Sequence, residues 1–182
     1  MEITQDFERQ ADEIIAQYPV KRSAAMLIMH MVQERFGYFD DDAIKYVAKK
    51  LEVAPVEVYG MLSFYPMFTD KPRGRIHIKV CRTLSCALAG SINFADEISK
   101  LADCPVNGTK GVYTIEFVEC LGNCVKGINV QVNDKLYESL KPQDAEKFFE
   151  TIRKADAEGA LAPAPMSATP QGEGFDSPAY KG

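Results

Sequence analysis

Four of the five cysteines fall into two closely spaced pairs. Cys81 and Cys86 enclose Arg-Thr-Leu-Ser, whereas Cys120 and Cys124 enclose Leu-Gly-Asn. Thiolates are the ligands that proteins use for structural zinc and for iron–sulfur clusters. In a chain with no sign of secretion, such pairs indicate metal or redox chemistry rather than structural disulfides.

Each pair follows directly on a predicted strand. The alternation of apolar residues predicts strands over 75–80 and 112–118. Two such loops at the same end of adjacent strands would bring four sulfurs together, enough for two ligands on each iron of a 2Fe-2S cluster. Gly122 and Gly127 allow tight turns that leave backbone N–H groups near the sulfurs. Such hydrogen bonds stabilise negative sulfur and raise the reduction potential.

Three other readings of these cysteines compete with the cluster. Structural zinc takes pairs separated most often by two residues, with up to four allowed. A thioredoxin-like dithiol enzyme needs a Cys-x-x-Cys pair, which this sequence does not contain. The third reading is that the four cysteines are buried and unconnected. The matched placement of the two pairs after two strands argues against it. The pattern favours a 2Fe-2S cluster over each of them.

Other residues with possible chemistry have simpler interpretations. Cys104 follows a predicted helix and is expected to be a plain structural cysteine. His30 lies on a Met-rich helix and is expected to pack there, and His77 alternates outward on the first strand and is expected to be solvated. The segment Ser63-Phe-Tyr-Pro-Met-Phe68 is an aromatic patch, expected to be buried between domains rather than offered to a partner.

Residues 1–70 have helical periodicity throughout. Pro19 stops a first helix, Gly37 ends a second, Asp40 or Asp41 begins a third and Pro55 is suited to the first position of a fourth. Short connections imply antiparallel neighbours, so this part is predicted to be a small helical bundle, and we expect it to dock on a partner.

Residues 71–156 have a different pattern, that of an α/β domain resembling thioredoxin. After the strand 75–80, apolar spacing predicts a helix over 86–101, and a last helix begins at Pro142. Further strands are predicted over 112–118, 129–132 and 135–140. The predicted fold class is therefore α+β, with a helical bundle followed by a thioredoxin-like ferredoxin domain.

Residues 157–182 are rich in Ala, Pro, Gly and Ser and form a predicted flexible tail. Leu161, Met166, Phe175 and Tyr180 are spaced like anchors that would order on a partner surface, and an inert tail is the equal alternative.

Composition and the absence of certain motifs argue against several function classes. The chain of 182 residues is 46% hydrophobic and 26% charged, with a formal net charge of -5, which gives no reason to expect nucleic-acid binding. It has no signal-peptide pattern, and its longest apolar stretch, 24–32, is too short to cross a bilayer. A cytoplasmic protein without direct membrane insertion is expected. No Gly-x-Gly-x-x-Gly or Walker motif is present, so hydride chemistry is expected on another subunit.

Several motifs resemble the NuoE subunit family of NADH:quinone oxidoreductase, respiratory complex I. The resemblance covers about residues 7–154 and is most specific at the double cysteine motif. The matching segments are Val80-Cys-Arg-Thr-Leu-Ser-Cys86, Glu119-Cys-Leu-Gly-Asn-Cys124, Val130-Gln-Val-Asn-Asp134 and Val58-Tyr59-Gly60.

This resemblance implies one 2Fe-2S cluster on Cys81, Cys86, Cys120 and Cys124. It also implies a partner subunit that carries FMN, the NADH site and a 4Fe-4S cluster. The chain would then be a non-catalytic subunit of a larger redox complex, peripheral to the inner membrane. The same module serves soluble NAD-reducing hydrogenases and NAD-dependent formate dehydrogenases, which is the second reading. One departure from the family is Ile128, where relatives usually have Pro after Gly or Ala.

Overall fold

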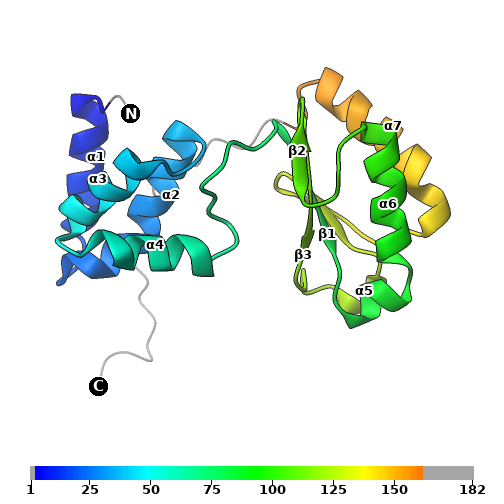
Figure 1. Cartoon of the computed structure of the whole chain (residues 1–182), viewed down its shortest axis with the longest axis horizontal. Coiled ribbons are helices and arrows are strands. Elements are labelled where there is room, and N and C mark those ends of the chain that lie inside the picture. The colour runs from blue at the N-terminus through cyan, green and yellow to red at the C-terminus, as the bar shows by residue number, and fades with distance from the viewer. Residues whose placement is uncertain (1–2, 162–182) are drawn as a thin grey trace, which may run out of the picture. The chain divides into compact units, whose positions relative to one another are not determined.

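The computed structural model describes residues 3–161 and divides into two compact units between Arg73 and Gly74 (Figure 1). The first unit consists of helices, and the second contains a mixed five-stranded sheet with its own helices. The predicted α+β class is confirmed. Each unit has a separate hydrophobic core, so each is described by itself.

The helical unit comprises α1 (Gln5–Ile15), η1 (Lys21–Ala24), α2 (Ala25–Phe36), α3 (Asp41–Leu51) and α4 (Pro55–Phe64). Local sequence sets its helix ends. The Asp40 carboxylate accepts a hydrogen bond from the Ala43 N–H at 2.8 Å and caps α3, so the first of the two aspartates considered from the sequence is the cap. Gly37 ends α2 with a φ of 85°, a conformation that costs glycine little.

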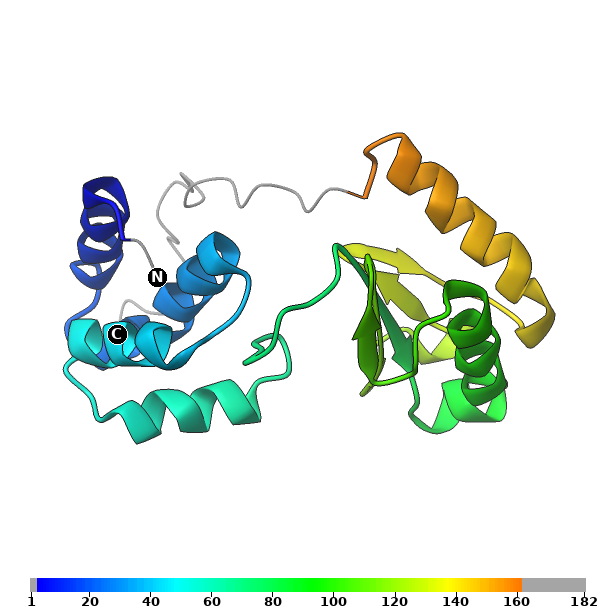
Figure 2. The ribbon, with the colours of Figure 1, turned by 45° about the horizontal axis from the view of Figure 1, so that its top comes forward.

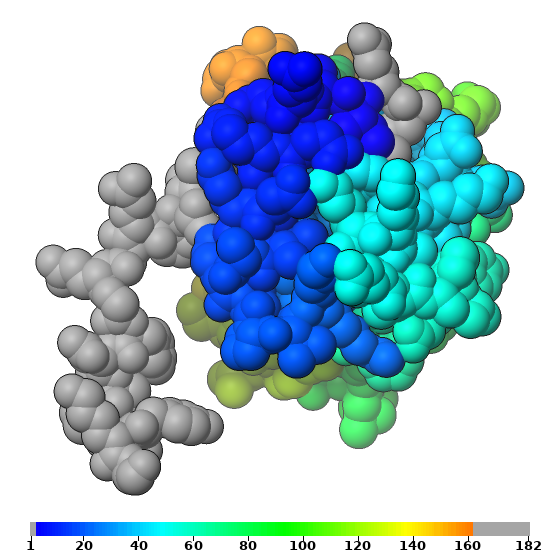
Figure 3. Space-filling view, turned by 90° about the vertical axis from the view of Figure 1, so that its left-hand side faces the viewer, coloured from blue at the N-terminus to red at the C-terminus, as the bar shows by residue number. Residues whose placement is uncertain are grey.

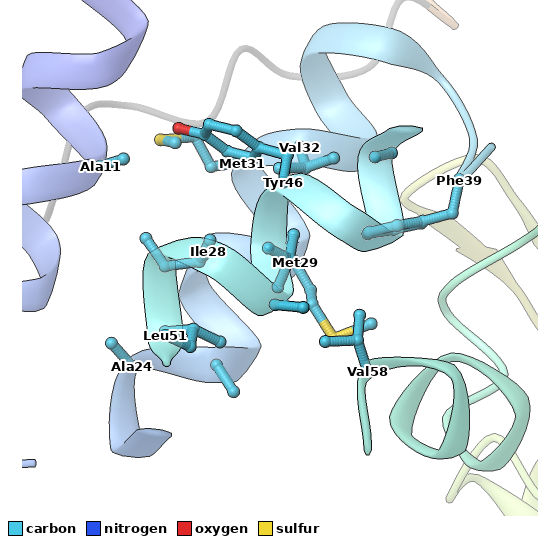
Figure 4. Close-up of a cluster of buried hydrophobic side chains, with 14 of the residues drawn as sticks. Ala11, Ala24, Ile28, Met29, Met31, Val32, Phe39, Tyr46, Leu51 and Val58 are labelled. Carbon is cyan, nitrogen blue, oxygen red and sulfur yellow. The ribbon is translucent and has the colours of Figure 1, made fainter. Parts of the chain in front are cut away.

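The core of this unit is built from α1, α2, α3 and α4 (Figure 4). Ile28, Met29 and Val32 on α2 are fully buried and pack with Val47 on α3 and Val58 on α4. Burial of this apolar surface is the main force that holds four short helices together.

At the surface of the helical unit, α1 and α3 lie next to each other on one face (Figure 3). Lys50 on α3 pairs there with Glu8 and Asp12 on α1, with 2.8 Å between Lys50 Nζ and the Asp12 carboxylate. The Lys50 side chain is only 18% exposed. The ion pairs therefore tie the first helix to the third beside the apolar core.

The sheet unit contains β1 (Ile76–Cys81), β2 (Gly108–Lys110), β3 (Tyr113–Val118), β4 (Val130–Val132) and β5 (Lys135–Tyr137). The strand order is β2-β3-β1-β4-β5. The central strand β1 pairs in parallel with β3 and antiparallel with β4, and the other pairings are antiparallel. The parallel pairing makes β1 and β3 end at the same edge of the sheet.

The helices of this unit are α5 (Leu84–Leu88), α6 (Ser91–Ala102) and α7 (Ala145–Ala157), with short turns η2 (Cys124–Lys126) and η3 (Pro142–Asp144). Figures 1 and 2 show α6 and α7 on the same side of the sheet. Alternate apolar residues of the strands, with Phe94 and Ile98 of α6 and Phe148 and Ile152 of α7, fill the space between them. The alternation that predicted the strands therefore also predicted their buried face.

Three local features differ from the sequence prediction. The helix expected over 86–101 is broken at Gly90, which has a φ of 98°. The Pro142 ring lies so close that a Cβ added at Gly90 would be only 2.6 Å from it. The short strand β2 was not predicted, because Gly-Thr-Lys has no apolar alternation. The last strand ends at Tyr137 rather than near residue 140, since Ser139 takes a positive φ of 58° that interrupts pairing.

The predicted start of the tail at Ala157 is also corrected. Leu161 is only 5% exposed and belongs to the core of the sheet unit. The Asn133 side-chain amide donates a 2.5 Å hydrogen bond to the Leu161 carbonyl. Leu161 is thus an internal core residue rather than an anchor for a partner, while Met166, Phe175 and Tyr180 lie outside the described residues.

Candidate functional site

The two cysteine pairs lie at the carboxyl ends of neighbouring parallel strands. In the register of β1 and β3, Cys81 is opposite Val118, so both strands end at one level. The loop after β1 leads to Cys86, and the loop after β3 carries Cys120 and Cys124. This is the placement that the sequence predicted from strand ends alone.

Regular structure holds the first pair. Cys81 is the last residue of β1, Cys86 lies on the short helix α5, and each is 1% exposed. Thr83 precedes α5, and its carbonyl accepts a hydrogen bond from the Ala87 N–H at 2.9 Å. The Thr83 hydroxyl lies 3.2 Å from Cys81 Sγ.

The second pair is exposed and lies in an irregular loop. The sulfurs of Cys120 and Cys124 are 3.3 Å apart. Gly122, with a φ of 82°, turns the chain so that its N–H points to Cys120 Sγ at 3.4 Å. The expectation that a glycine turn would place a backbone donor at a sulfur is therefore confirmed for Gly122.

Neighbouring groups shift the thiol pKa values in opposite directions within each pair. Burial would raise the pKa of Cys81, but hydrogen bonds from the Thr83 hydroxyl and from backbone N–H groups outweigh it and lower that pKa. Burial raises the pKa of Cys86. In the second pair, the Gly122 N–H lowers the pKa of Cys120, whereas Cys120 itself raises the pKa of Cys124.

The two pairs also act on each other electrostatically. After the larger effect of Cys120, the charges of Cys86 and Cys81 add to the rise in the pKa of Cys124. The Thr83 hydroxyl lowers the pKa of both Cys81 and Cys120, one from each pair. The pKa of a thiol in each loop therefore depends on groups of the other loop.

Two asparagines that the sequence prediction missed belong to this site. Asn129 is 1% exposed, and its side-chain amide lies 3.6 Å from Cys86 Sγ and 2.7 Å from the Asn123 carbonyl. A polar residue that begins the otherwise apolar alternation 129–132, directly after a cysteine loop, is the sequence signal that could have identified it. Asn123 lies inside the second cysteine pair, where no comparable signal marked it.

The donor set fits a 2Fe-2S cluster. Sulfur donors arrive as two pairs, as two irons with two thiolates each require, and N–H or O–H groups lie beside Cys81, Cys86 and Cys120. Gly127 lies beside the site, where an added Cβ would be in van der Waals contact with Cys86 Sγ at 3.4 Å. Across residues 3–161, no three or more His, Cys, Asp and Glu side chains are grouped closely enough to surround one metal ion.

Of the residues given simpler interpretations, Cys104 and His77 are both buried. Cys104 is 1% exposed, and its sulfur lies 3.5–3.7 Å from backbone carbonyls in the sheet unit. His77 was expected to be solvated, which is wrong: it is 8% exposed, and its Nε2 lies 2.6 Å from a Glu116 oxygen on β3. The outward face of a central strand is covered by its neighbours' long side chains, which alternation alone does not reveal.

His30 and the aromatic segment 63–68 lie in the helical unit. His30 packs against Phe68 with ring centroids 4.9 Å apart, as expected of a packing residue. Phe68 is buried in the helical core, whereas Phe64 is 77% exposed. The segment therefore has one residue inside this unit's own core and one at its surface.

A family model for thioredoxin-like [2Fe-2S] ferredoxins matches residues 11–153. The chain belongs to this family. Its members are 2Fe-2S electron-transfer modules, which agrees with the thiol placement described above. Membership also confirms the thioredoxin-like character of the sheet unit, which was inferred from the order of its elements.

Relatives with known names support the resemblance to complex I subunits. The E subunit of NADH-quinone oxidoreductase from Rickettsia bellii is 38% identical over 153 residues, covering 79% of this chain and 89% of the relative. NADH-quinone oxidoreductase subunit 2 of Thermus thermophilus is 36% identical over 162 residues, covering 87% and 82% respectively. The resemblance to the NuoE family is therefore confirmed over most of both chains.

Among solved structures, a chain of an NAD+-reducing [NiFe]-hydrogenase in its air-oxidised state shares the fold with a TM-score of 0.60. It is 15% identical and covers 75% of this chain, which spans only 25% of the hydrogenase chain. Within residues 3–161, no helix has the length and apolar character needed to cross a bilayer.

Proposed function

We propose that this chain is the 2Fe-2S electron-transfer subunit of the NADH-oxidising module of NADH:quinone oxidoreductase. Cys81, Cys86, Cys120 and Cys124 are the proposed cluster ligands. The observation that carries the proposal is the position of two thiol pairs at the carboxyl ends of the parallel strands β1 and β3.

When bound, the cluster supplies storage for one electron at a time. The positions of the four cysteines determine where the cluster is held and which side of it a partner can approach. Burial of Cys81 and Cys86 fixes one side of the site inside the domain, while exposure of Cys120 and Cys124 leaves the other side open to a partner. An open side is what exchange of single electrons with a group on another subunit requires.

The proposed partner is a flavin subunit that carries FMN, the NADH site and a 4Fe-4S cluster. Identity of 38% with the Rickettsia bellii relative over most of both chains supports this assignment. The chain by itself would neither bind nor oxidise NADH, and the complex would hold it at the cytoplasmic face of the inner membrane. The helical unit and the residues beyond 161 are the proposed contacts with the partner.

The second candidate is the same module in a soluble NAD-reducing hydrogenase or an NAD-dependent formate dehydrogenase. The likeness to the hydrogenase chain concerns fold alone, because only 15% of residues are identical. The named relatives that cover the chain at 36–39% identity favour complex I. Identification of the proteins that co-purify with the native chain distinguishes the two.

Metal analysis tests the cofactor directly. Protein purified without added metal should be reddish-brown, with about two irons and two acid-labile sulfides per chain and an EPR signal only after reduction. Stoichiometric zinc without labile sulfide would refute the proposal.

Reduction by NADH tests the assigned role. The isolated chain should not be reduced by NADH, because the sequence contains no dinucleotide-binding motif. Addition of catalytic amounts of the flavin subunit should allow NADH to bleach the visible absorption of the chain. NADH oxidation by the flavin-free chain alone would contradict this division of labour.

A further inference from the structure

A buried amide network connects the two cysteine loops. Asn129 begins the segment that leads into β4 and is 1% exposed, so its polar atoms must find partners inside the protein. Its amide group has two N–H bonds, and the two neighbours in reach are Cys86 Sγ at 3.6 Å and the Asn123 carbonyl at 2.7 Å. One side chain thus joins a sulfur of the first loop to the backbone of the second.

The backbone of Asn129 strengthens the same connection. Its carbonyl accepts a 3.1 Å hydrogen bond from the Cys81 N–H. Its N–H also acts on Cys86, where it opposes the effect of burial on the thiol pKa. Asn129 therefore contacts both cysteines of the first loop as well as the residue that directly precedes Cys124.

Asn123 extends the network to the surface. Its amide nitrogen lies 3.3 Å from Asn129 Oδ1 and 2.6 Å from a carboxylate oxygen of Glu138. The other carboxylate oxygen of Glu138 accepts a hydrogen bond from Lys126 Nζ at 2.5 Å. These contacts hold both ends of the 123–126 segment, which contains Cys124 but otherwise has only one short turn.

We propose that Asn129 is a positioning residue for the 2Fe-2S site, holding the two cysteine loops together and donating a hydrogen bond to the sulfur of Cys86. The inference rests on the proposed function, since it assumes that Cys86 is a cluster ligand. A donor at a ligand sulfur stabilises the reduced cluster, which has the greater negative charge, and so raises its reduction potential.

The main test compares the wild type with Asn129→Leu, which keeps side-chain size but has no donor. At a fixed solution potential near the midpoint, the ratio of oxidised to reduced cluster should rise about tenfold in the variant. This change corresponds to about 59 mV for a one-electron couple, towards more negative potential. A redox titration followed by EPR measures the ratio, and the EPR g-values report any change at the sulfur ligands.

Asn133 provides a matched control in the same unit. It is also a bridging asparagine, accepting from the His77 N–H at 2.9 Å and donating to the Leu161 carbonyl, but it contacts none of the four cysteines. Asn133→Ala should lower the unfolding temperature and leave the reduction potential unchanged. An unchanged potential in cluster-loaded Asn129→Leu would overturn the proposal and leave Asn129 a purely structural residue.

If Asn129→Leu binds no cluster, Asn129→Asp provides a second test of the positioning role. It keeps the shape but replaces the donor with an acceptor beside Cys86, and it should lower the potential further than leucine would. Loss of cluster in both Asn129 variants, with full loading in an equally destabilised Asn133→Ala, would support the positioning role. Equal loss in all three would overturn it. Wild-type protein without iron and sulfide would instead refute the proposed function, before any variant is compared.

Discussion

The two cysteine loops reach one end of the sheet by different means. Cys81 and Cys86 lie on a strand and a helix and are almost fully buried, so the fold itself sets their positions. Cys120 and Cys124 are exposed on an irregular loop that side-chain hydrogen bonds from Asn123 and Asn129 hold in place. The difference suggests that the first loop is formed by folding alone, while the second gains order from local polar contacts and from the proposed cluster.

The largest expected effect is loss of the cluster when a proposed ligand cysteine is replaced, and it can be measured separately from the effect on stability. Cys86→Ala and Cys124→Ala should each lose the cluster, because each would leave one iron with a single thiolate. In the apoproteins, Cys86→Ala should lower the free energy of unfolding by about 1 kcal/mol, as is usual for truncation of a buried side chain, and Cys124→Ala by less than about 0.5 kcal/mol. Iron and sulfide analysis with urea denaturation measures both effects. A full visible spectrum in either variant would contradict the proposed ligand set.

Truncation at the C-terminus tests whether the fold can be weakened without disturbing the loops. A chain that ends at Gly159 loses Leu161 from the core, which should cost about 1.5–3 kcal/mol of unfolding free energy. The spectrum of the loaded protein should not change, because Leu161 hydrogen-bonds Asn133, which follows β4, whereas Asn129 at the cysteine loops precedes β4. A chain that ends at Ala162 is the matched control and should unfold at the wild-type temperature. A lower temperature for both chains would show that residues beyond 162 contribute to the fold.

The sequence predicted the parts of the molecule that depend on periodicity and on strand ends. Alternating residues identified β1 and β3, and their ends correctly placed both cysteine pairs on one edge. Missed features depend on contacts between residues distant in sequence: the break at Gly90 comes from Pro142, the burial of His77 from its surroundings in the sheet, and the role of Asn129 from Cys86. Composition also misassigned Leu161, because an apolar residue in a Gly- and Pro-rich context has no periodicity to reveal that it packs on the core.

Replacement of Cys104 tests whether truncating a buried cysteine outside the proposed ligand set affects cluster binding. Cys104 is as buried as Cys86, but its sulfur contacts backbone carbonyls, whereas the sulfur of Cys86 lies beside the Asn129 amide. Cys104→Ala should therefore keep full iron and sulfide while losing about 1 kcal/mol of unfolding free energy. A colourless Cys104→Ala protein with wild-type folding would mean that the ligand set includes Cys104.

The smallest expected effect concerns the hydroxyl of Thr83, which lies beside Cys81 in the first loop. Its oxygen is 3.2 Å from Cys81 Sγ, and a thiolate has no proton, so in the loaded protein Thr83 would be the donor. Thr83→Val keeps the shape of the side chain and removes the donor. At a fixed solution potential, the ratio of oxidised to reduced cluster should then rise about threefold, as expected for a hydrogen bond worth somewhat less than 1 kcal/mol. Thr83→Ser retains the hydroxyl and should return the ratio to nearly the wild-type value in the same EPR titration. If the valine and serine variants shift the ratio equally, the effect comes from packing before α5 rather than from the hydrogen bond. The geometry of the first loop would then be set by regular structure alone.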